Sequence, residues 1–298
     1  MTRAALLILF TAIAFASPAA AKKLEVVASF SIVGDMVARV GGEDVTVTVL
    51  IGPNGDAHTF EPTPAHARAL AAADIVFANG LGFEPWLDRL ATSANAKAKL
   101  VHVTKGLSAR AFDDGDHGHN HAQDPHAWQD ARNALIYVAN IAQALAAKDP
   151  ANAARYNARA DAYRKDLRAL DVDIRARFAA IPSRERRVIT SHDAFGYFAA
   201  AYGIAFLAPL GTSTETQASA KGVARLITQI RRENIKAVFV ENISDPRLIE
   251  QIARETGVKI GGKLYSDALS PKDGPAPDYL AMMRHNTALL TAAMASGS

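Results

Sequence analysis

The stretch ANAARYNARADAYRKDLRALDVDIRARFAA, residues 151–180, decides the fold of this chain. It contains no Gly or Pro, and the Ile181-Pro182 step that follows it ends a helix. Its apolar side chains recur at helical spacing and predict one packing face: Tyr156, Ala160, Tyr163, Leu167, Leu170, Ile174 and Phe178. A continuous helix here would be about 45 Å long, at about 1.5 Å per residue. A helix of this length can bridge two lobes.

The chain before this helix alternates between strand-like and helix-like segments. Short β-branched and apolar runs predict strands at residues 24–29, 45–51, 75–78 and 100–103. Helical patterns lie at residues 32–40, from Pro64 onward with Thr63 as N-cap, at 85–90 and at 130–147. Asp149-Pro150 separates the last of these from the long helix.

The same alternation resumes after the long helix. Strands are predicted at residues 187–190, 204–208, 236–240 and 258–264, and helices at 194–202, 218–233, 246–255 and 277–294. Strands that alternate with helices indicate parallel sheets with right-handed crossovers. We therefore predict an α/β fold of two lobes, each with about four parallel strands flanked by helices, joined by one long rigid helix. The predicted parts are residues 22–150, 151–181 and 182–298.

The first 21 residues have the pattern of a secretory signal peptide. One charge, Arg3, precedes the apolar run Ala4 to Phe15, and small residues follow up to Ala21. The alternative is a membrane anchor helix, but the run is shorter than the roughly 20 residues that span a bilayer. We expect cleavage near Ala21 and a periplasmic location.

Composition excludes several other classes of protein. The chain contains no cysteine, which rules out disulfides, thiolate metal sites, cysteine nucleophiles and a lipid attached to cysteine. We therefore expect the mature protein to be free in the periplasm. The formal net charge is +3, and Lys and Arg are spread along the chain rather than gathered in a stripe. This distribution argues against a nucleic-acid partner.

Four candidate metal ligands follow predicted strands. They are His58, His126, His192 and Asp267. Parallel α/β sheets form ligand sites beyond the carboxyl ends of their strands, and each predicted lobe supplies two of the four residues. One ion in the cleft between the lobes would satisfy all of them. Three imidazoles and one carboxylate suit tetrahedral zinc, whereas manganese prefers more oxygen ligands.

Four motifs in this order resemble the zinc/manganese solute-binding proteins of ABC transporters. They are His58-Thr-Phe-Glu-Pro-Thr-Pro64, Asp124-Pro-His-Ala-Trp128, Ser191-His-Asp-Ala-Phe-Gly-Tyr197 and Tyr265-Ser-Asp267. The resemblance covers nearly the whole mature chain and includes the long central helix. It implies that His58, His126, His192 and Asp267 hold the metal, and that release involves local loop and lobe shifts more than a wide hinge closure. Histidine at position 192 resembles the zinc branch.

The resemblance also implies partners. The expected partner is an ABC-transporter permease at the inner membrane, which would draw Zn²⁺ from a monomeric binding protein. A periplasmic zinc metallochaperone stays open as a metal donor.

A second candidate metal-binding segment precedes His126. Histidines alternate with small residues in the Gly-rich stretch from Asp113 to His121, and its candidate ligands are Asp116, His117, His119 and His121. Such tracts can gather metal ions, and zinc-type relatives often carry one here. The alternative is a solvated acidic loop with chance histidines. Any site here is expected to be weaker than the main one.

Six other residues are weaker candidates. Glu61 is either an outer partner of His58 or a charge before the Pro64 helix, and we favour the latter. Asp124 and Asp193 can either orient the ligand histidines or cap helices. His66, His102 and His285 are interpreted as structural or surface residues.

Two other functions compete with zinc transport. A zinc hydrolase keeps one coordination position open for water, and here a fourth protein ligand fills it. The chain also has no His-Glu-x-x-His or Gly-x-Ser-x-Gly motif, so we do not expect an enzyme. An adhesin is disfavoured because no surface anchor is evident. Within the transporter class, manganese or iron uptake is the alternative to zinc.

Overall fold

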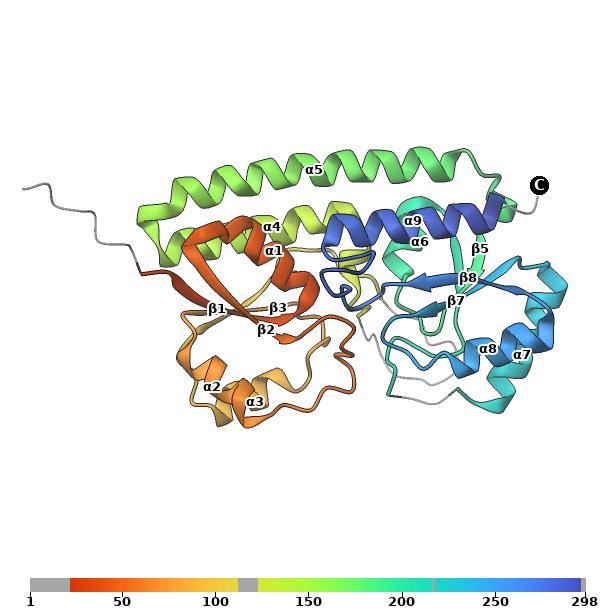
Figure 1. Cartoon of the computed structure of the whole chain (residues 1–298), viewed down its shortest axis with the longest axis horizontal. Coiled ribbons are helices and arrows are strands. Elements are labelled where there is room, and N and C mark those ends of the chain that lie inside the picture. Colours follow the sequence, from red (N-terminus) through yellow and green to blue (C-terminus); the bar gives the residue numbers. More distant parts are fainter. Residues whose placement is uncertain (1–21, 112–122, 216–217, 296–298) are drawn as a thin grey trace, which may run out of the picture.

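Two α/β halves lie side by side beneath one long helix in the computed structural model, which describes residues 22–111, 123–215 and 218–295 (Figure 1). The predicted signal peptide and the candidate ligands at 116–121 lie outside these residues. Within the described ranges, no helix combines the length and hydrophobicity needed to cross a membrane.

The first half is built on a parallel sheet in the strand order β2-β1-β3-β4. Its strands are β1 (Leu24–Phe30), β2 (Val45–Ile51), β3 (Ile75–Ala78) and β4 (Lys99–His102). Helices α1 (Ser31–Gly41) and α4 (Ala131–Lys148) lie on one side of the sheet, and α2 (Pro64–Ala72) and α3 (Leu87–Ser93) on the other (Figure 1). The central strand β3 is wholly buried, as expected for a sheet covered on both faces.

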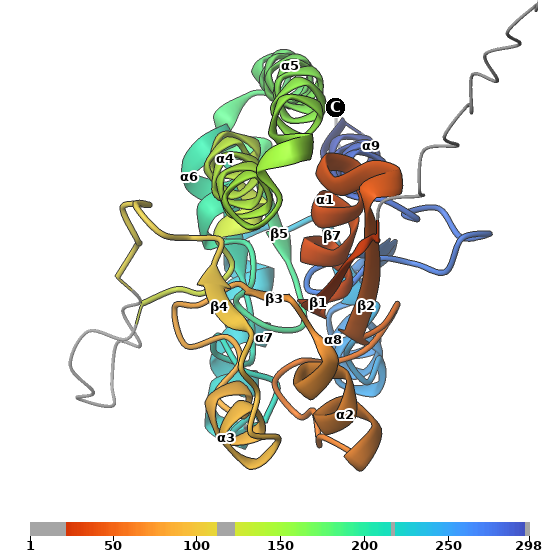
Figure 2. The ribbon, with the colours of Figure 1, turned by 90° about the vertical axis from the view of Figure 1, so that its left-hand side faces the viewer.

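The second half repeats this plan with the strand order β6-β5-β7-β8. Its parallel strands are β5 (Arg187–Ile189), β6 (Ala205–Leu207), β7 (Ala237–Glu241) and β8 (Lys259–Leu264). Helices α6 (Gly196–Tyr202) and α9 (Tyr279–Ala295) lie toward the long helix, and α7 (Ala220–Glu233) and α8 (Arg247–Thr256) on the opposite side (Figures 1 and 2). The predicted fold class is confirmed.

The long helix α5 (Ala153–Ala179) contacts α1 and α4 of the first half and α6 and α9 of the second. All seven apolar residues of its predicted packing face are buried. The helix begins two residues later than predicted, because Pro150–Asn152 form a separate 3₁₀ turn. Its single buried face follows the helical repeat along its whole length, so one rigid rod packs against both halves.

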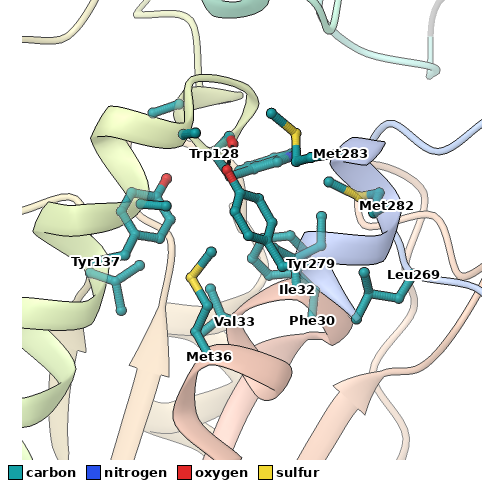
Figure 3. Packing of buried hydrophobic residues seen from close by; sticks show 14 of the residues in the cluster. Phe30, Ile32, Val33, Met36, Trp128, Tyr137, Leu269, Tyr279, Met282 and Met283 are labelled. Carbon is teal, nitrogen blue, oxygen red and sulfur yellow. Dashed lines mark hydrogen bonds between the residues drawn. The ribbon is translucent and has the colours of Figure 1, made fainter. Parts of the chain in front are cut away.

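A continuous hydrophobic core joins the two halves at their centre. Figure 3 shows Phe30 and Ile32 packing beneath Tyr279 and Trp128, with Met282 and Met283 of α9 beside them. The Tyr279 hydroxyl donates a hydrogen bond to the Trp128 carbonyl oxygen at 2.6 Å. Trp128 Nε1 in turn donates to the carbonyl oxygen of Ser266 at 2.8 Å. The loops that carry His126 and Asp267 are therefore tied to each other through buried side chains.

Candidate metal centre

The four predicted ligand residues meet between the two halves. His58 follows β2, His126 lies in the segment after β4, His192 follows β5 and Asp267 follows β8. Parallel strands all end at the same edge of a sheet, and the side chains that follow the strands of the two sheets meet in one cluster. The structure brings together all four side chains that the sequence selected.

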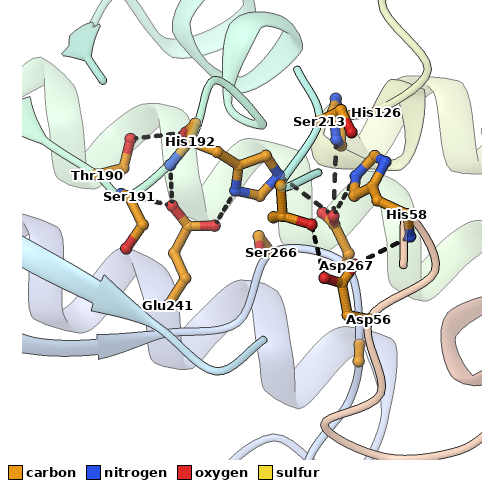
Figure 4. Close-up of polar contacts among 12 residues, drawn as sticks. Asp56, His58, His126, Thr190, Ser191, His192, Ser213, Glu241, Ser266 and Asp267 are labelled. Carbon is orange, nitrogen blue, oxygen red and sulfur yellow. Dashed lines mark hydrogen bonds and ion pairs between the residues drawn. The ribbon is translucent and has the colours of Figure 1, made fainter. Parts of the chain in front are cut away.

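Asp267 lies at the centre of the cluster. Its Oδ2 atom is 3.1 Å from His58 Nε2, 3.7 Å from His126 Nε2 and 3.2 Å from His192 Nε2 (Figure 4). One ligand atom from each of the four residues lies within 4.8 Å of the others. Ligand atoms around a tetrahedral zinc ion, with bonds of about 2.0 Å, lie about 3.3 Å apart. The cluster therefore has the dimensions of a four-coordinate cation site.

The site is closed to solvent. His126, His192 and Asp267 have no exposed surface, and His58 is 9% exposed. Among the described residues, four side-chain atoms of this cluster have no hydrogen-bond partner: His126 Nε2, His192 Nδ1, His192 Nε2 and Asp267 Oδ1. Buried polar atoms are rarely left without a partner in folded proteins. A bound cation would satisfy three of them, and the fourth, His192 Nδ1, lies 2.6 Å from Glu241 Oε2.

A short Asp-x-His turn orients His126. The Asp124 Oδ1 atom accepts hydrogen bonds from the backbone N–H of His126 at 3.0 Å and is 2.9 Å from His126 Nδ1. Asn79 Nδ2 donates to the carbonyl oxygen of Pro125 at 2.9 Å and fixes the middle of the turn. Of the two roles predicted for Asp124, the structure therefore supports orientation of the histidine ring.

A second Asp-x-His turn precedes His58. Asp56 Oδ1 accepts a hydrogen bond from the His58 backbone N–H at 2.9 Å. Asp56 Oδ2 accepts from the hydroxyls of Thr59 at 3.1 Å and of Thr214 at 2.6 Å. Thr214 belongs to the second half of the molecule. Asp56 therefore holds the His58 loop and also ties it to the second half of the molecule.

The partner of His192 is Glu241, which the sequence reasoning missed. Glu241 Oε2 lies 2.6 Å from His192 Nδ1, and Glu241 is 1% exposed at the end of β7. Asp193 was considered for this role, but the carboxylate that lies against His192 Nδ1 is that of Glu241. The signal for Glu241 was an acidic side chain at the end of an apolar strand, because such a residue is buried and needs a partner.

The carboxylates of the cluster raise the pKa of two histidines, and these histidines lower the pKa of Asp267. Burial by itself would lower the pKa of His126, but the Asp267 and Asp124 carboxylates raise it to about 9. Burial also opposes charge on His192, and Glu241 and Asp267 nevertheless raise its pKa well above the usual range. Burial would raise the pKa of Asp267, yet the His126 and His192 imidazoliums hold it well below its usual range. Protons on His126 and His192 therefore compete with a cation at this site.

The remaining candidates lie apart from this cluster. Glu61 is exposed just before α2. His66 Nδ1 accepts from the Thr63 backbone N–H at 3.0 Å and completes a capping box at the start of α2. His285 Nε2 is 3.0 Å from the carbonyl oxygen of Lys263, and His102 ends β4. All four fit structural or surface roles.

Comparison with known proteins identifies one family for this chain. Residues 26–293 match the model of the family described as "Zinc-uptake complex component A periplasmic". The chain is 35% identical to the iron-binding protein YfeA of Yersinia pestis over 265 residues, which cover 88% of this chain and 84% of that protein. It is 32% identical to the manganese-binding lipoprotein MntA of Halalkalibacterium halodurans, with coverage of 88% and 86%.

Solved structures share the fold over nearly the full length. The periplasmic zinc binding protein TroA from Treponema pallidum superimposes with a TM-score of 0.85 at 27% identity, covering 91% of this chain and 99% of that one. The metals named for these similar proteins are iron, manganese and zinc. Metal binding is thus common to the group, whereas the metal differs among its members.

Proposed function

The chain belongs to the family of periplasmic zinc-uptake components, the substrate-binding proteins of metal ABC transporters, and on this premise we propose that its cargo is Zn²⁺. In this proposal, His58, His126, His192 and Asp267 bind the ion in the cleft, and the protein delivers it to an ABC permease for import. The family consists of solute-binding transport proteins rather than enzymes.

One observation carries the choice of zinc. Three imidazole Nε2 atoms surround a single carboxylate oxygen, at 3.1, 3.2 and 3.7 Å. Nitrogen-rich four-coordinate sites favour zinc, and oxygen-rich sites with six ligands favour manganese. The names of the relatives include manganese and iron, so these ions are the competitors in the test below.

Capture and release follow from the protonation of the site. Zn²⁺ binds deprotonated Nε2 atoms, so it displaces the protons that His126 and His192 otherwise hold. Helix α5 packs against both halves, so a wide hinge opening would have to break these contacts. We therefore propose that the permease releases the ion by small shifts of the ligand loops, such as the one held by Asp56 and Thr214.

We propose that the protein works as a monomer in the periplasm after removal of residues 1–21. Its proposed parts are the lobes 22–150 and 182–298 and the linking helix 151–181. Relatives such as MntA are named as lipoproteins. This chain has no cysteine to carry a lipid, which supports a protein free in the periplasm.

Metal analysis tests the cargo. The metal-free protein is dialysed against equal concentrations of Zn²⁺, Mn²⁺ and Fe²⁺ under anaerobic conditions, and the bound metal is measured by mass spectrometry. We expect one Zn²⁺ per chain at the main site. Preferential binding of manganese or iron would overturn the zinc assignment and leave the metal-transport family membership intact.

A further inference from the structure

We propose that Glu241 is a positioning residue that fixes the tautomer of His192, keeping the proton on Nδ1 and the lone pair of Nε2 free for the cation. This inference rests on the proposed role of His192 as a metal ligand. Glu241 does not itself contact the ion site, because its carboxylate faces the opposite edge of the His192 ring from Asp267 (Figure 4).

Two backbone donors and one ring nitrogen converge on the Glu241 carboxylate. Its Oε1 atom accepts hydrogen bonds from the backbone N–H groups of Ser191 at 2.7 Å and His192 at 2.9 Å. Its Oε2 atom lies 2.6 Å from His192 Nδ1. At that distance a proton must lie between the nitrogen and the oxygen, because two bare lone pairs would repel each other. When Nε2 of the neutral ring binds a cation, the single ring proton is on Nδ1, so the nitrogen supplies the proton that faces Oε2.

Only a carboxylate, which accepts hydrogen bonds on both of its oxygen atoms, fits all three contacts of Glu241. Glutamine has the same shape as glutamate, but one of its two terminal atoms is a donor. If its oxygen keeps the Ser191 and His192 backbone hydrogen bonds, its NH₂ group faces Nδ1 and favours the tautomer with the proton on Nε2. If the amide is reversed, NH₂ meets two backbone N–H groups. Both arrangements oppose metal binding by His192.

Asp124 offers a matched contrast in the first half. Its Oδ1 atom alone receives both the His126 backbone N–H at 3.0 Å and His126 Nδ1 at 2.9 Å. Its Oδ2 atom lies 4.0 Å from Arg110 Nε. Asparagine can therefore keep both contacts through one oxygen and turn its NH₂ toward the Oδ2 position. The tautomer of His126 is preserved in this variant.

The experiment compares the isosteric variants Glu241→Gln and Asp124→Asn with Glu241→Asp and the unchanged protein. Zinc affinity is measured by competition with a chelator. Loss of an outer-shell partner typically weakens metal binding by about 10–100-fold. We expect Glu241→Gln to fall in that range and Asp124→Asn to lose less than about tenfold. Glu241→Asp keeps an acceptor-only carboxylate and should recover part of the loss.

A spectroscopic measurement separates the tautomer from a general structural effect. The ¹⁵N shifts of the His192 ring in the zinc-loaded unchanged protein should report a protonated Nδ1 and a metal-bound Nε2. The opposite assignment overturns the inference even if Glu241→Gln does not fold. Equal zinc affinities of Glu241→Gln and Asp124→Asn also overturn it.

A fourth variant, His192→Ala, separates a failure of the proposed function from a failure of the proposed role of Glu241. If it leaves zinc affinity unchanged, His192 is not a ligand and the proposed function fails at that residue. If it abolishes tight binding while Glu241→Gln retains full affinity, only the role of Glu241 is lost.

Discussion

The two halves of the molecule each contribute two residues to the cluster, but they hold them in different ways. In the first half, an aspartate two residues earlier in the chain accepts the backbone N–H of each histidine: Asp56 for His58 and Asp124 for His126. In the second half, the carboxylate that holds His192 comes from Glu241 on a different strand. The first half fixes its histidines by local sequence, and the second depends on sheet pairing.

The hydrophobic cores of the two halves also differ, because among the described residues only the second half has a separate small core cluster. The first sheet, helix α5 and one face of the second sheet share one continuous core. The other face of the second sheet packs against α7 and α8 through a small separate cluster that includes Ile189, Val238 and Ile252. Ile189 of β5 pairs with Val238 of β7. The small cluster therefore supports the strand pair that aligns His192 with Glu241.

Removal of a ligand should have the largest effect and should erase the difference between the halves. We expect His126→Ala and His192→Ala to weaken zinc binding far more than the roughly 100-fold upper range for outer-shell partners, because each leaves three ligands. Chelator competition measures both affinities, and His285→Ala, outside the site, serves as control. Near-normal zinc binding by either ligand variant would contradict its assignment.

Lower pH should weaken zinc binding through both halves. The pKa of His126 is raised to about 9 and that of His192 lies well above its usual range, so protons compete with the ion below these values. Each proton displaced changes the affinity by about tenfold per pH unit. We expect affinity to fall steadily as pH decreases from about 9, measured by titration at several pH values. A flat profile between pH 9 and pH 6 would contradict the protonation described for the cluster.

Matched cavity-forming substitutions in α8 and α2 test whether zinc binding depends on the packing of the second sheet. Ile252→Ala in α8 and Leu70→Ala in α2 each remove a fully buried side chain and should cost about 2–5 kcal/mol in the free energy of unfolding. We expect only Ile252→Ala to lower zinc affinity as well, because it loosens the packing beneath β7 and Glu241. Denaturant unfolding and zinc titration provide the two measurements. Equal effects on zinc affinity would remove the contrast between the halves.

The contact between Asp56 and Thr214 should give the smallest effect. Thr214→Val removes the 2.6 Å hydrogen bond that crosses the cleft, and Thr59→Val removes a 3.1 Å bond to the same oxygen within the first half. One hydrogen bond contributes about 1 kcal/mol, or roughly fivefold in a rate or equilibrium constant. We expect faster zinc dissociation in Thr214→Val, measured by stopped-flow chelation, and less change in Thr59→Val. The reverse order would show that the cross-cleft contact does not retain the ion.

The sequence by itself determined the elements and the choice of the four clustered residues. Helix α5 was predictable because its apolar residues keep the helical repeat between two prolines, Pro150 and Pro182. The strands were predictable to within a residue or two, because turn residues and helices separate short apolar runs. His58, His126, His192 and Asp267 stood out because each follows a strand, and parallel strands end at one edge.

Only the tertiary structure decided how the second half supports its histidine. Asp124 lies two residues from His126, so its role was readable as a local motif. Glu241 is 49 residues from His192 in the chain, and its strand could have paired elsewhere in the sheet. His192 lies three positions after Ile189, and Glu241 lies three positions after Val238. Because Ile189 pairs with Val238, the pairing places His192 beside Glu241. Strand order and register depend on packing across whole sheets, which no local pattern encodes.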